Sequence, residues 1–327
     1  MFEVNAQAGQ HVVIVTDTAH DPLVWQAVAT CVHELGATPS VMLFPPRPAD
    51  YLDPPEPVVE AMTRADLVVL VATTGMFHSP AGHRTMGAGV PTIVMDGGIT
   101  ADMLTRGGVT ADYQQMLRTR YALGKRLEGA RMARLRSSLG TDVTYSVEGR
   151  IFVPKEPDGS RHPLKVFRRA EEGRKGSPLY GVVFPGLEFN IPPVEGTANG
   201  VIVVDTTLHQ IGLLQQPIRF AVHQGRIKSI EGGYQARELE EYIRRFGDEN
   251  AWHMPVEASI GLNPEARITG VQREDKNILG AIHVALGRND DIGGTIYSKL
   301  HLDGVILRPT LEVDGRLIIE DGRLIGV

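Results

Sequence analysis

Cysteine is nearly absent from this sequence of 327 residues, in which Cys31 is the single thiol. One cysteine cannot form an internal disulfide, so nothing in the chain requires an oxidising compartment. Apolar residues recur with helical spacing over residues 24–35. We therefore interpret Cys31 as a core residue of a helix and not as a nucleophile.

Long apolar runs are also missing. No stretch approaches the roughly 20 apolar residues that a membrane-spanning helix needs. The first ten residues, MFEVNAQAGQ, lack the basic start and the apolar run of a signal peptide. We expect a cytoplasmic protein that has no membrane partner.

The chain lacks an excess of basic charge, because its formal net charge is −6. Nucleic-acid binders usually carry a basic face, since neutralising phosphates supplies most of their affinity. The basic residues between positions 118 and 136 are interrupted by Glu128 and have the spacing of an exposed helix face. We therefore expect no nucleic-acid partner.

Three common nucleotide-binding and catalytic motifs are absent. Gly124-Lys125 lacks the upstream glycine and the following Ser or Thr of a phosphate-binding loop. Residues 17–20, DTAH, stand where a G-x-G-x-x-G turn would follow the first strand, and the chain has no G-x-S-x-G elbow. A dinucleotide cofactor and a serine-hydrolase mechanism are thus disfavoured.

The first half of the chain alternates apolar strand patterns with helical patterns, which predicts an α/β fold with a doubly wound parallel sheet over residues 1–155. The expected strands are residues 11–16, 40–44, 66–72 and 91–94, and the expected helices are residues 22–35, 57–63, 80–87 and about 111–134. Loops at the carboxyl ends of such strands commonly line a ligand crevice. We accordingly predict that Thr74 and His78 contact a substrate, although helix capping or loop packing explains them equally well.

The second half, residues 156–327, reads as a mainly antiparallel β (α+β) domain that binds metal. Residues 159–178 are rich in charge, glycine and proline, which indicates a linker or long loop. One helix is expected at residues 236–246. A hairpin is expected from residues 306–313 to residues 316–319, because Asp-Gly between apolar strands is a strong turn signal.

Polar residues embedded in the apolar runs of this half are candidate metal ligands. His301 and Asp303 would lie on the same face of a strand and form a natural ligand pair for Zn, Mn, Co or Fe. His283, Glu257 and Glu188 are each a lone polar residue among apolar ones, and a buried carboxylate without a partner is very costly.

Two interpretations of these embedded residues remain open. In the first, each has its own local partner, for example Arg267 or Arg273 for Glu257 and a backbone carbonyl for His283. For any single residue the local partner is the better interpretation. For the embedded acids and histidines taken together, one metal ion that they all bind becomes a competitive interpretation.

The segments EASIGLNPEARITG, EDKNILGAIHVALG and GGTIYSKLHLDGVI resemble the metallo-aminopeptidase family typified by aminopeptidase T and aminopeptidase S, and the resemblance extends over nearly the whole chain. That family has a two-metal site with glutamate, histidine and aspartate ligands. The resemblance implies a homodimer and the metal ligands Glu188, Glu257, His283, His301 and Asp303. Ile296 stands where the family has asparagine, and Asp275 stands where it has a glutamate before Lys276.

The segment IKSIEGGYQARELEEYIRRFGDENAW is similar to the 2,5-dihydroxypyridine 5,6-dioxygenases of the same superfamily. The resemblance implies a single iron held by two histidines and an aspartate, to which His301 and Asp303 correspond. The second histidine of that iron site corresponds to Glu257 in this chain. The residue that corresponds to His283 is not a histidine in those dioxygenases.

Our leading hypothesis is a metal-dependent hydrolase of an amide-type bond in a small molecule or short peptide, with Zn, Mn or Co as cofactor. Glu188 or Asp275 would be the general base. The alternative is a mononuclear Fe(II) dioxygenase that cleaves a hydroxylated pyridine or related ring, with His283, His301 and Asp303 as its facial triad. A third possibility is a non-catalytic binding protein that has kept the fold.

Overall fold

The computed structural model describes residues 5–150, 181–290 and 292–326, which form two compact units. Unit 1 consists of Met1–Val109 and Pro154–Pro185, and unit 2 consists of Thr110–Val153 and Gly186–Val327. The predicted domain boundary at residue 155 differs from this division. The predicted linker at residues 159–178 lies outside the described residues.

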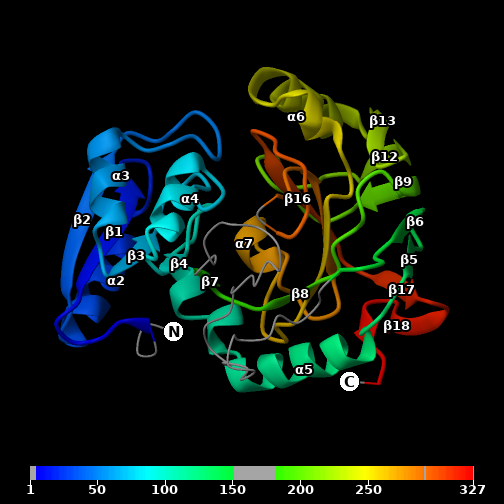
Figure 1. Ribbon diagram of the computed structural model, residues 1–327. Helices are drawn as coiled ribbons and strands as arrows, with labels where there is room; N and C mark the ends of the chain where they lie inside the picture. Colours follow the sequence, from blue (N-terminus) through cyan, green and yellow to red (C-terminus); the bar gives the residue numbers. More distant parts are fainter. Residues whose placement is uncertain (1–4, 151–180, 291, 327) are drawn as a thin grey trace. The chain divides into compact units, whose positions relative to one another are not determined.

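The described part of unit 1 contains a five-stranded parallel sheet with the strand order β2-β1-β3-β4-β7 (Figure 1). Its elements are β1 (His11–Asp17), α2 (Pro22–Glu34), β2 (Thr38–Phe44), α3 (Glu56–Thr63), β3 (Leu67–Leu70), α4 (Pro80–Gly87), β4 (Thr92–Val94) and β7 (Gly181–Val183). Every residue of β3 and β4 is buried, as expected for the central strands of a sheet covered on both faces.

The strand order makes this sheet doubly wound. The chain passes from β1 outward to β2, and then returns across β1 to β3 and β4. Because parallel crossovers are right-handed, the change of direction places α2 on one face and α3 and α4 on the other, and α3 contacts α4. The predicted α/β fold of the first half is confirmed.

Unit 2 is built on two antiparallel sheets, of eight strands in the order β13-β12-β9-β6-β5-β17-β18-β19 and of six in the order β11-β10-β16-β15-β14-β8, counted over the described residues. The larger sheet contains β5 (Met132–Ser137), β6 (Asp142–Ser146), β9 (Asn199–Val204), β12 (Ile218–His223), β13 (Arg226–Glu231), β17 (Pro309–Val313), β18 (Arg316–Glu320) and β19 (Arg323–Leu324). The smaller contains β8 (Glu188–Asn190), β10 (Thr207–Leu208), β11 (Gly212–Leu213), β14 (Glu257–Gly261), β15 (Ile282–Gly287) and β16 (His301–Ile306).

The hairpin formed by β5 and β6 explains why the predicted domain boundary at residue 155 differs from the division into two units. β5 pairs with β17, and β6 pairs with β9, so residues 132–146 form the middle of the larger sheet. Helix α5 (Tyr113–Arg126) ends well before the predicted residue 134, because the chain turns at Gly129, whose φ is 76°. Figure 1 shows α5 running beside β8.

Most other predicted elements of unit 2 are confirmed. Helix α6 spans Gly233–Phe246, and Asp314 and Gly315 turn between β17 and β18 with φ of 48° and 74°. The expected strand at residues 306–313 is wrong, because β16 ends at Ile306 in the smaller sheet and β17 begins at Pro309 in the larger. No helix among the described residues is long and apolar enough to cross a membrane.

Candidate metal centre

Four neighbouring strands of the smaller sheet carry all five predicted metal ligands. In spatial order, β16 carries His301 and Asp303, β15 carries His283, β14 begins at Glu257, and β8 begins at Glu188. All five residues are buried. The fold therefore brings together the five residues that the aminopeptidase resemblance implies, although the first and last are more than one hundred positions apart in the sequence.

The strand register places these side chains on one face of the sheet. Asp303 pairs with Ala285, which pairs on its other side with Glu257. Directly opposed residues of antiparallel strands point to the same face, and so do residues two apart in one strand. His301 and His283 therefore share this face, as does Glu188, which pairs with Gly261.

Each candidate ligand lies opposite at least one small residue on a neighbouring strand, although His283 also faces Val305 on β16. His301 faces Gly287, His283 faces Ser259, and both Asp303 and Glu257 face Ala285. Because neighbouring strands are only about 5 Å apart, larger residues at these positions would fill the space above the sheet. The smaller residues leave room for the imidazoles and carboxylates to converge.

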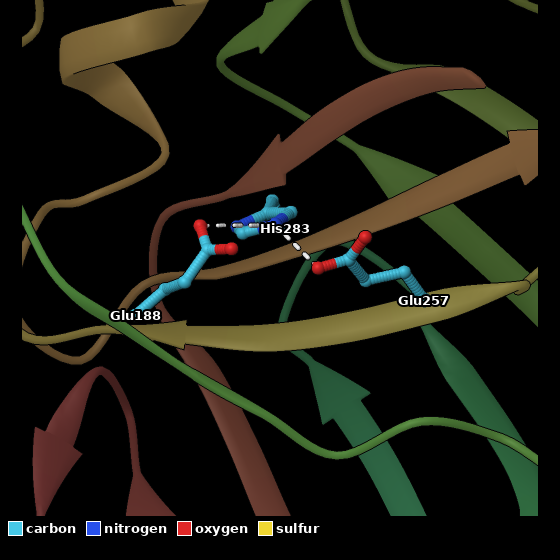
Figure 2. A group of neighbouring side chains, drawn as sticks. All are labelled: Glu188, Glu257 and His283. Atoms are coloured by element: carbon cyan, nitrogen blue, oxygen red, sulfur yellow. Dashed lines mark ion pairs between the residues drawn. The ribbon is translucent and has the colours of Figure 1, made fainter. Parts of the chain in front are cut away.

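Glu257 lies at the middle of the cluster and presents one oxygen to each histidine. Its Oε1 is 3.6 Å from His283 Nε2, and its Oε2 is 3.2 Å from His301 Nε2. Figure 2 shows Glu188 and Glu257 on either side of His283, and Glu188 Oε2 is 3.7 Å from His283 Nε2. Ser259 Oγ and Asn190 Nδ2 donate to Glu257 Oε1 over 2.8 Å and 3.2 Å and hold the carboxylate in place.

Ligand atoms that lie within 4.8 Å of one another define two overlapping groups. The His283 group consists of Glu188, Glu257 and His283, and the His301 group consists of Glu257, His301 and Asp303. The two groups share Glu257. Each contains one histidine and two carboxylates.

His301 is held in the tautomer that suits metal binding. Its Nδ1 is 2.7 Å from the carbonyl oxygen of Arg288. A carbonyl only accepts hydrogen bonds, so Nδ1 carries a proton and donates, and Nε2 is the nitrogen that a metal would take. Nε2 points toward Glu257 and lies 3.1 Å from Asp303 Oδ1.

Helix α7 (Gln272–Asp275) and the residue after it supply polar side chains to Asp303. Gln272 Nε2 donates a hydrogen bond to Asp303 Oδ2, and Lys276 Nζ lies 3.2 Å from the same oxygen. Lys276 Nζ also lies 3.3 Å from Glu188 Oε2. Oδ1 of Asp303 remains directed toward His301.

The electrostatics of the cluster show that its carboxylates require positive charge nearby. Burial by itself raises the pKa of Glu257, but the proximity of His283 and His301 outweighs it and holds the pKa well below its usual range. Burial likewise raises the pKa of Asp303, and the charges of Lys276 and His301 lower it well below normal. Burial lowers the pKa of His301, while Asp303 and Glu257 raise it well above normal.

The residues fit a bound divalent cation. Four polar atoms of the cluster are buried without a hydrogen-bond partner: Nδ1 and Nε2 of His283, Oε2 of Glu188 and Oδ1 of Asp303. Imidazole nitrogens and carboxylate oxygens together suit Zn, Mn, Co or Fe. Because such atoms are costly when buried unpaired, a shared cation explains the set.

The local-partner interpretation is not supported. Glu257 contacts the two histidines, Ser259 and Asn190, whereas Arg267 pairs with Glu274 over 3.3 Å. Neither ring nitrogen of His283 has a hydrogen-bond partner among the described residues, so no backbone carbonyl holds its ring.

Asp275 is fully buried but has a different environment from the five ligands. Its Oδ1 accepts hydrogen bonds from the backbone N–H and the hydroxyl of Thr269, both over 2.7 Å. Its Oδ2 accepts from Gly270 N over 2.9 Å and from the Thr207 hydroxyl. A carboxylate with four donors is poorly suited to take a proton from substrate, and these bonds indicate that Asp275 anchors the turn before α7.

The predicted substrate contacts Thr74 and His78 belong to unit 1. The ring of His78 makes edge contacts with Tyr51 and Phe77, at centroid distances of 5.4 Å and 5.0 Å. The loop is fixed by buried carboxylates, among them Asp96, whose Oδ2 accepts from Met76 N over 2.6 Å. A substrate-binding role for Thr74 and His78 stays a prediction.

Sequence reasoning missed Lys276 and Gln272 as site residues. A lysine beside charged neighbours reads as an exposed position, yet the Lys276 side chain is only 8% exposed. One signal was present: residues four apart on a helical turn project to the same side, which places Gln272 and Lys276 together on Asp303 Oδ2.

Two comparisons with known proteins identify the same family. A family model described as "NicX: 2,5-dihydroxypyridine 5,6-dioxygenase" matches residues 2–157 and 180–326. The chain is 24% identical over 278 residues to the 2,5-dihydroxypyridine 5,6-dioxygenase of Pseudomonas putida KT2440, covering 81% of this chain and 72% of that protein.

Two solved structures share the fold. The structure of 2,5-dihydroxypyridine dioxygenase from Pseudomonas putida KT2440 has a TM-score of 0.76 and 19% identity, covering 100% of this chain and 96% of that one. Wild-type AmpT from Thermus thermophilus has a TM-score of 0.63 and 14% identity, covering 99% and 96%. These likenesses confirm the two-domain fold. Together with the family match and the 24% identical relative, they confirm the predicted membership of a superfamily that includes both proteins.

Proposed function

Because the chain belongs to the 2,5-dihydroxypyridine 5,6-dioxygenase (NicX) family, we propose that it is a metal-dependent enzyme acting on a small nitrogen-containing molecule. The family match and the buried donor set both support an enzyme over a non-catalytic binding protein. The proposed site is the cluster formed by Glu188, Glu257, His283, His301 and Asp303.

Hydrolysis of an amide-type bond is the reaction that the donor geometry supports best. The observation that carries this proposal is Glu257, which presents a different oxygen to each histidine. The His283 group and the His301 group would each hold one divalent ion, with Glu257 between them. When bound, such ions polarise a carbonyl and lower the pKa of a coordinated water.

The chain's own residues would contribute orientation and proton transfer. Ser259 and Asn190 fix the carboxylate of Glu257, and the Arg288 carbonyl fixes the ring of His301. Glu188 is the better general base of the two predicted, because Asp275 accepts four hydrogen bonds, whereas Glu188 Oε2 accepts none from the described residues and has the ammonium of Lys276 3.3 Å away. The expected substrate is a small amide or a short peptide.

Ring cleavage of a hydroxylated pyridine by Fe(II) and oxygen is the second candidate, and the comparisons favour it over hydrolysis. The family match and the 24% identical relative both carry that activity in their names. A facial triad requires two histidines and one carboxylate around one ion. Here neither three-residue group contains two histidines, and His283, His301 and Asp303 are not gathered as a group.

One experiment separates the two reactions. Metal content is measured by elemental mass spectrometry on protein purified without oxygen, and the same sample is assayed with amide substrates under nitrogen and with 2,5-dihydroxypyridine in air. About two Zn, Mn or Co ions per chain with amide turnover under nitrogen supports hydrolysis. About one iron per chain, with oxygen consumed on the hydroxypyridine, establishes ring cleavage instead and ends the hydrolase proposal.

A further inference from the structure

The ammonium of Lys276 closes a ring of neighbouring charged and imidazole side chains around the proposed metal centre. Lys276 Nζ lies 3.3 Å from Glu188 Oε2, in the His283 group, and 3.2 Å from Asp303 Oδ2, in the His301 group. Glu257 links the two groups on one side through the histidines. Lys276 links them on the other side, so one internal cation touches both groups.

The position of Lys276 is fixed by the fold. Its side chain is 8% exposed, and its backbone N–H donates to the carbonyl of Gln272 over 3.1 Å at the end of α7. The preceding residue, Asp275, is tied to Thr269 and Gly270. The backbone at Lys276 is therefore held in place, and its buried ammonium lies beside the two carboxylates.

The charges in the ring balance one divalent ion better than two. Glu188, Glu257 and Asp303 contribute three negative charges and Lys276 contributes one positive charge, which leaves two negative charges when the imidazoles are neutral. One divalent ion neutralises this sum, and a second ion leaves an excess of two positive charges. Uncompensated charge in a buried site is strongly unfavourable.

Other nearby charges increase this imbalance. The charge of Arg273 acts on Lys276, and the charge of Arg120 acts on Glu188, and both are cations. Neither supplies the negative charge that a second ion requires. A second ion therefore has to bind against repulsion, with compensation from an anion such as hydroxide or a substrate group.

We propose that Lys276 is a positioning residue that makes the two ion positions unequal, so that the first divalent ion binds tightly and the second binds weakly. This inference rests on the two ion positions of the proposed function and not on the reaction performed there. Lys276 restrains Glu188 and Asp303 and sets how many ions the site holds at a given metal concentration.

The test is a manganese titration of the full-length chain. The protein is dialysed against graded free Mn²⁺, bound manganese is counted by elemental mass spectrometry, and Mn²⁺ spin resonance distinguishes isolated from coupled ions. The wild-type protein is expected to show two dissociation constants at least about tenfold apart, a difference of about 1.4 kcal/mol. Lys276→Met is expected to lower the second constant at least tenfold, and the first constant less.

Two controls separate charge from structure. Lys276→Arg keeps the positive charge and should keep the second ion weak. Lys228→Met removes an exposed lysine on β13 and should leave both constants unchanged. Lys276→Gln is a second neutral variant, with circular dichroism used to check the fold of each protein.

Equal dissociation constants in the wild-type protein would overturn the proposal without any variant. An unchanged second constant in folded Lys276→Met or Lys276→Gln would overturn it too. These outcomes are independent of catalysis. If the manganese results are as expected but no amide is hydrolysed, the hydrolase proposal fails while the assignment of Lys276 stands.

Discussion

At the scale of single residues, Glu257 and Asp275 are two buried acids with opposite surroundings. Glu257 lies between two histidines, and its Oε1 accepts hydrogen bonds from Ser259 and Asn190. Asp275 accepts four hydrogen bonds from its own neighbourhood and from Thr207. The first arrangement suits a ligand shared between ions, and the second suits a structural anchor.

Glu257→Gln should therefore remove both ions, whereas His283→Ala should remove only the ion of the His283 group. Turnover should fall at least about 100-fold in either case, because even residues that only support metal ligands cost 10- to 100-fold when changed. Metal per chain is measured by elemental mass spectrometry. His223→Ala, on the exposed end of β12, is the matched control. Full metal content in Glu257→Gln would remove the shared-ligand assignment.

Asp275→Asn should destabilise the protein without emptying the site. The amide cannot accept all four hydrogen bonds, and a buried donor without a partner costs about 1–3 kcal/mol. The free energy of unfolding is measured in urea, with metal content determined on the same sample. A folded variant that keeps its stability and its metal but loses turnover would restore Asp275 as the general base.

At the scale of elements, the position of α7 depends on the close approach of the segment after it to β14. A Cβ on Gly261 would overlap the carbonyl oxygen of Ile278 and lie 2.6 Å from the carbonyl carbon of Asn277. Gly261 also pairs with Glu188 in the sheet. One glycine thus allows β14 to bring together a metal ligand and the segment that carries Lys276.

Gly261→Ala should destabilise the protein by about 1–3 kcal/mol, as overpacking of a filled interior usually does. It should also weaken metal binding, since residues 276–278 must shift. Thermal unfolding and manganese titration are the measurements. Gly129→Ala is the control for metal binding: its φ of 76° makes alanine strained there, but a Cβ meets nothing within 4 Å, so it should destabilise the protein without weakening metal binding. Equal effects of the two substitutions on metal binding would contradict the close-approach argument.

At the scale of the whole molecule, we expect metal binding and folding to be coupled. The buried carboxylates of the centre repel one another, and a ligand that binds only the folded state stabilises it. The homodimer expected from the aminopeptidase resemblance stays a prediction, which light scattering against a chain mass of 35.6 kDa would test.

Removal of metal by a chelator should lower the midpoint of thermal unfolding. At a metal concentration 100 times the dissociation constant, the bound ion contributes about 2.7 kcal/mol. Scanning calorimetry with and without chelator, followed by restoration with Mn²⁺ or Zn²⁺, measures the difference. An identical midpoint in all three samples would show that the cluster does not hold a metal in the folded protein.

The sequence by itself determined most of the elements and selected the candidate ligands. Periodicity placed β1, α4 and α6 within a few residues, because these patterns depend on local geometry and burial. The pair His301 and Asp303 followed from the alternation of side chains along a strand, and the register confirms their common face. Glu188, Glu257 and His283 are each a single polar residue within an apolar run. The family resemblance grouped them with His301 and Asp303 as candidate ligands.

Only the tertiary structure decided how distant segments combine. The pairing of β5 and β6 with β17 and β9 assigned residues 132–146 to unit 2, against the predicted boundary, because strand pairing at long range leaves no local signal. The same is true of Lys276, which looks like a surface lysine in sequence and becomes an internal cation only when α7 packs on β16. The sharing of Glu257 between two histidines is likewise a property of register, and register is fixed by the whole sheet.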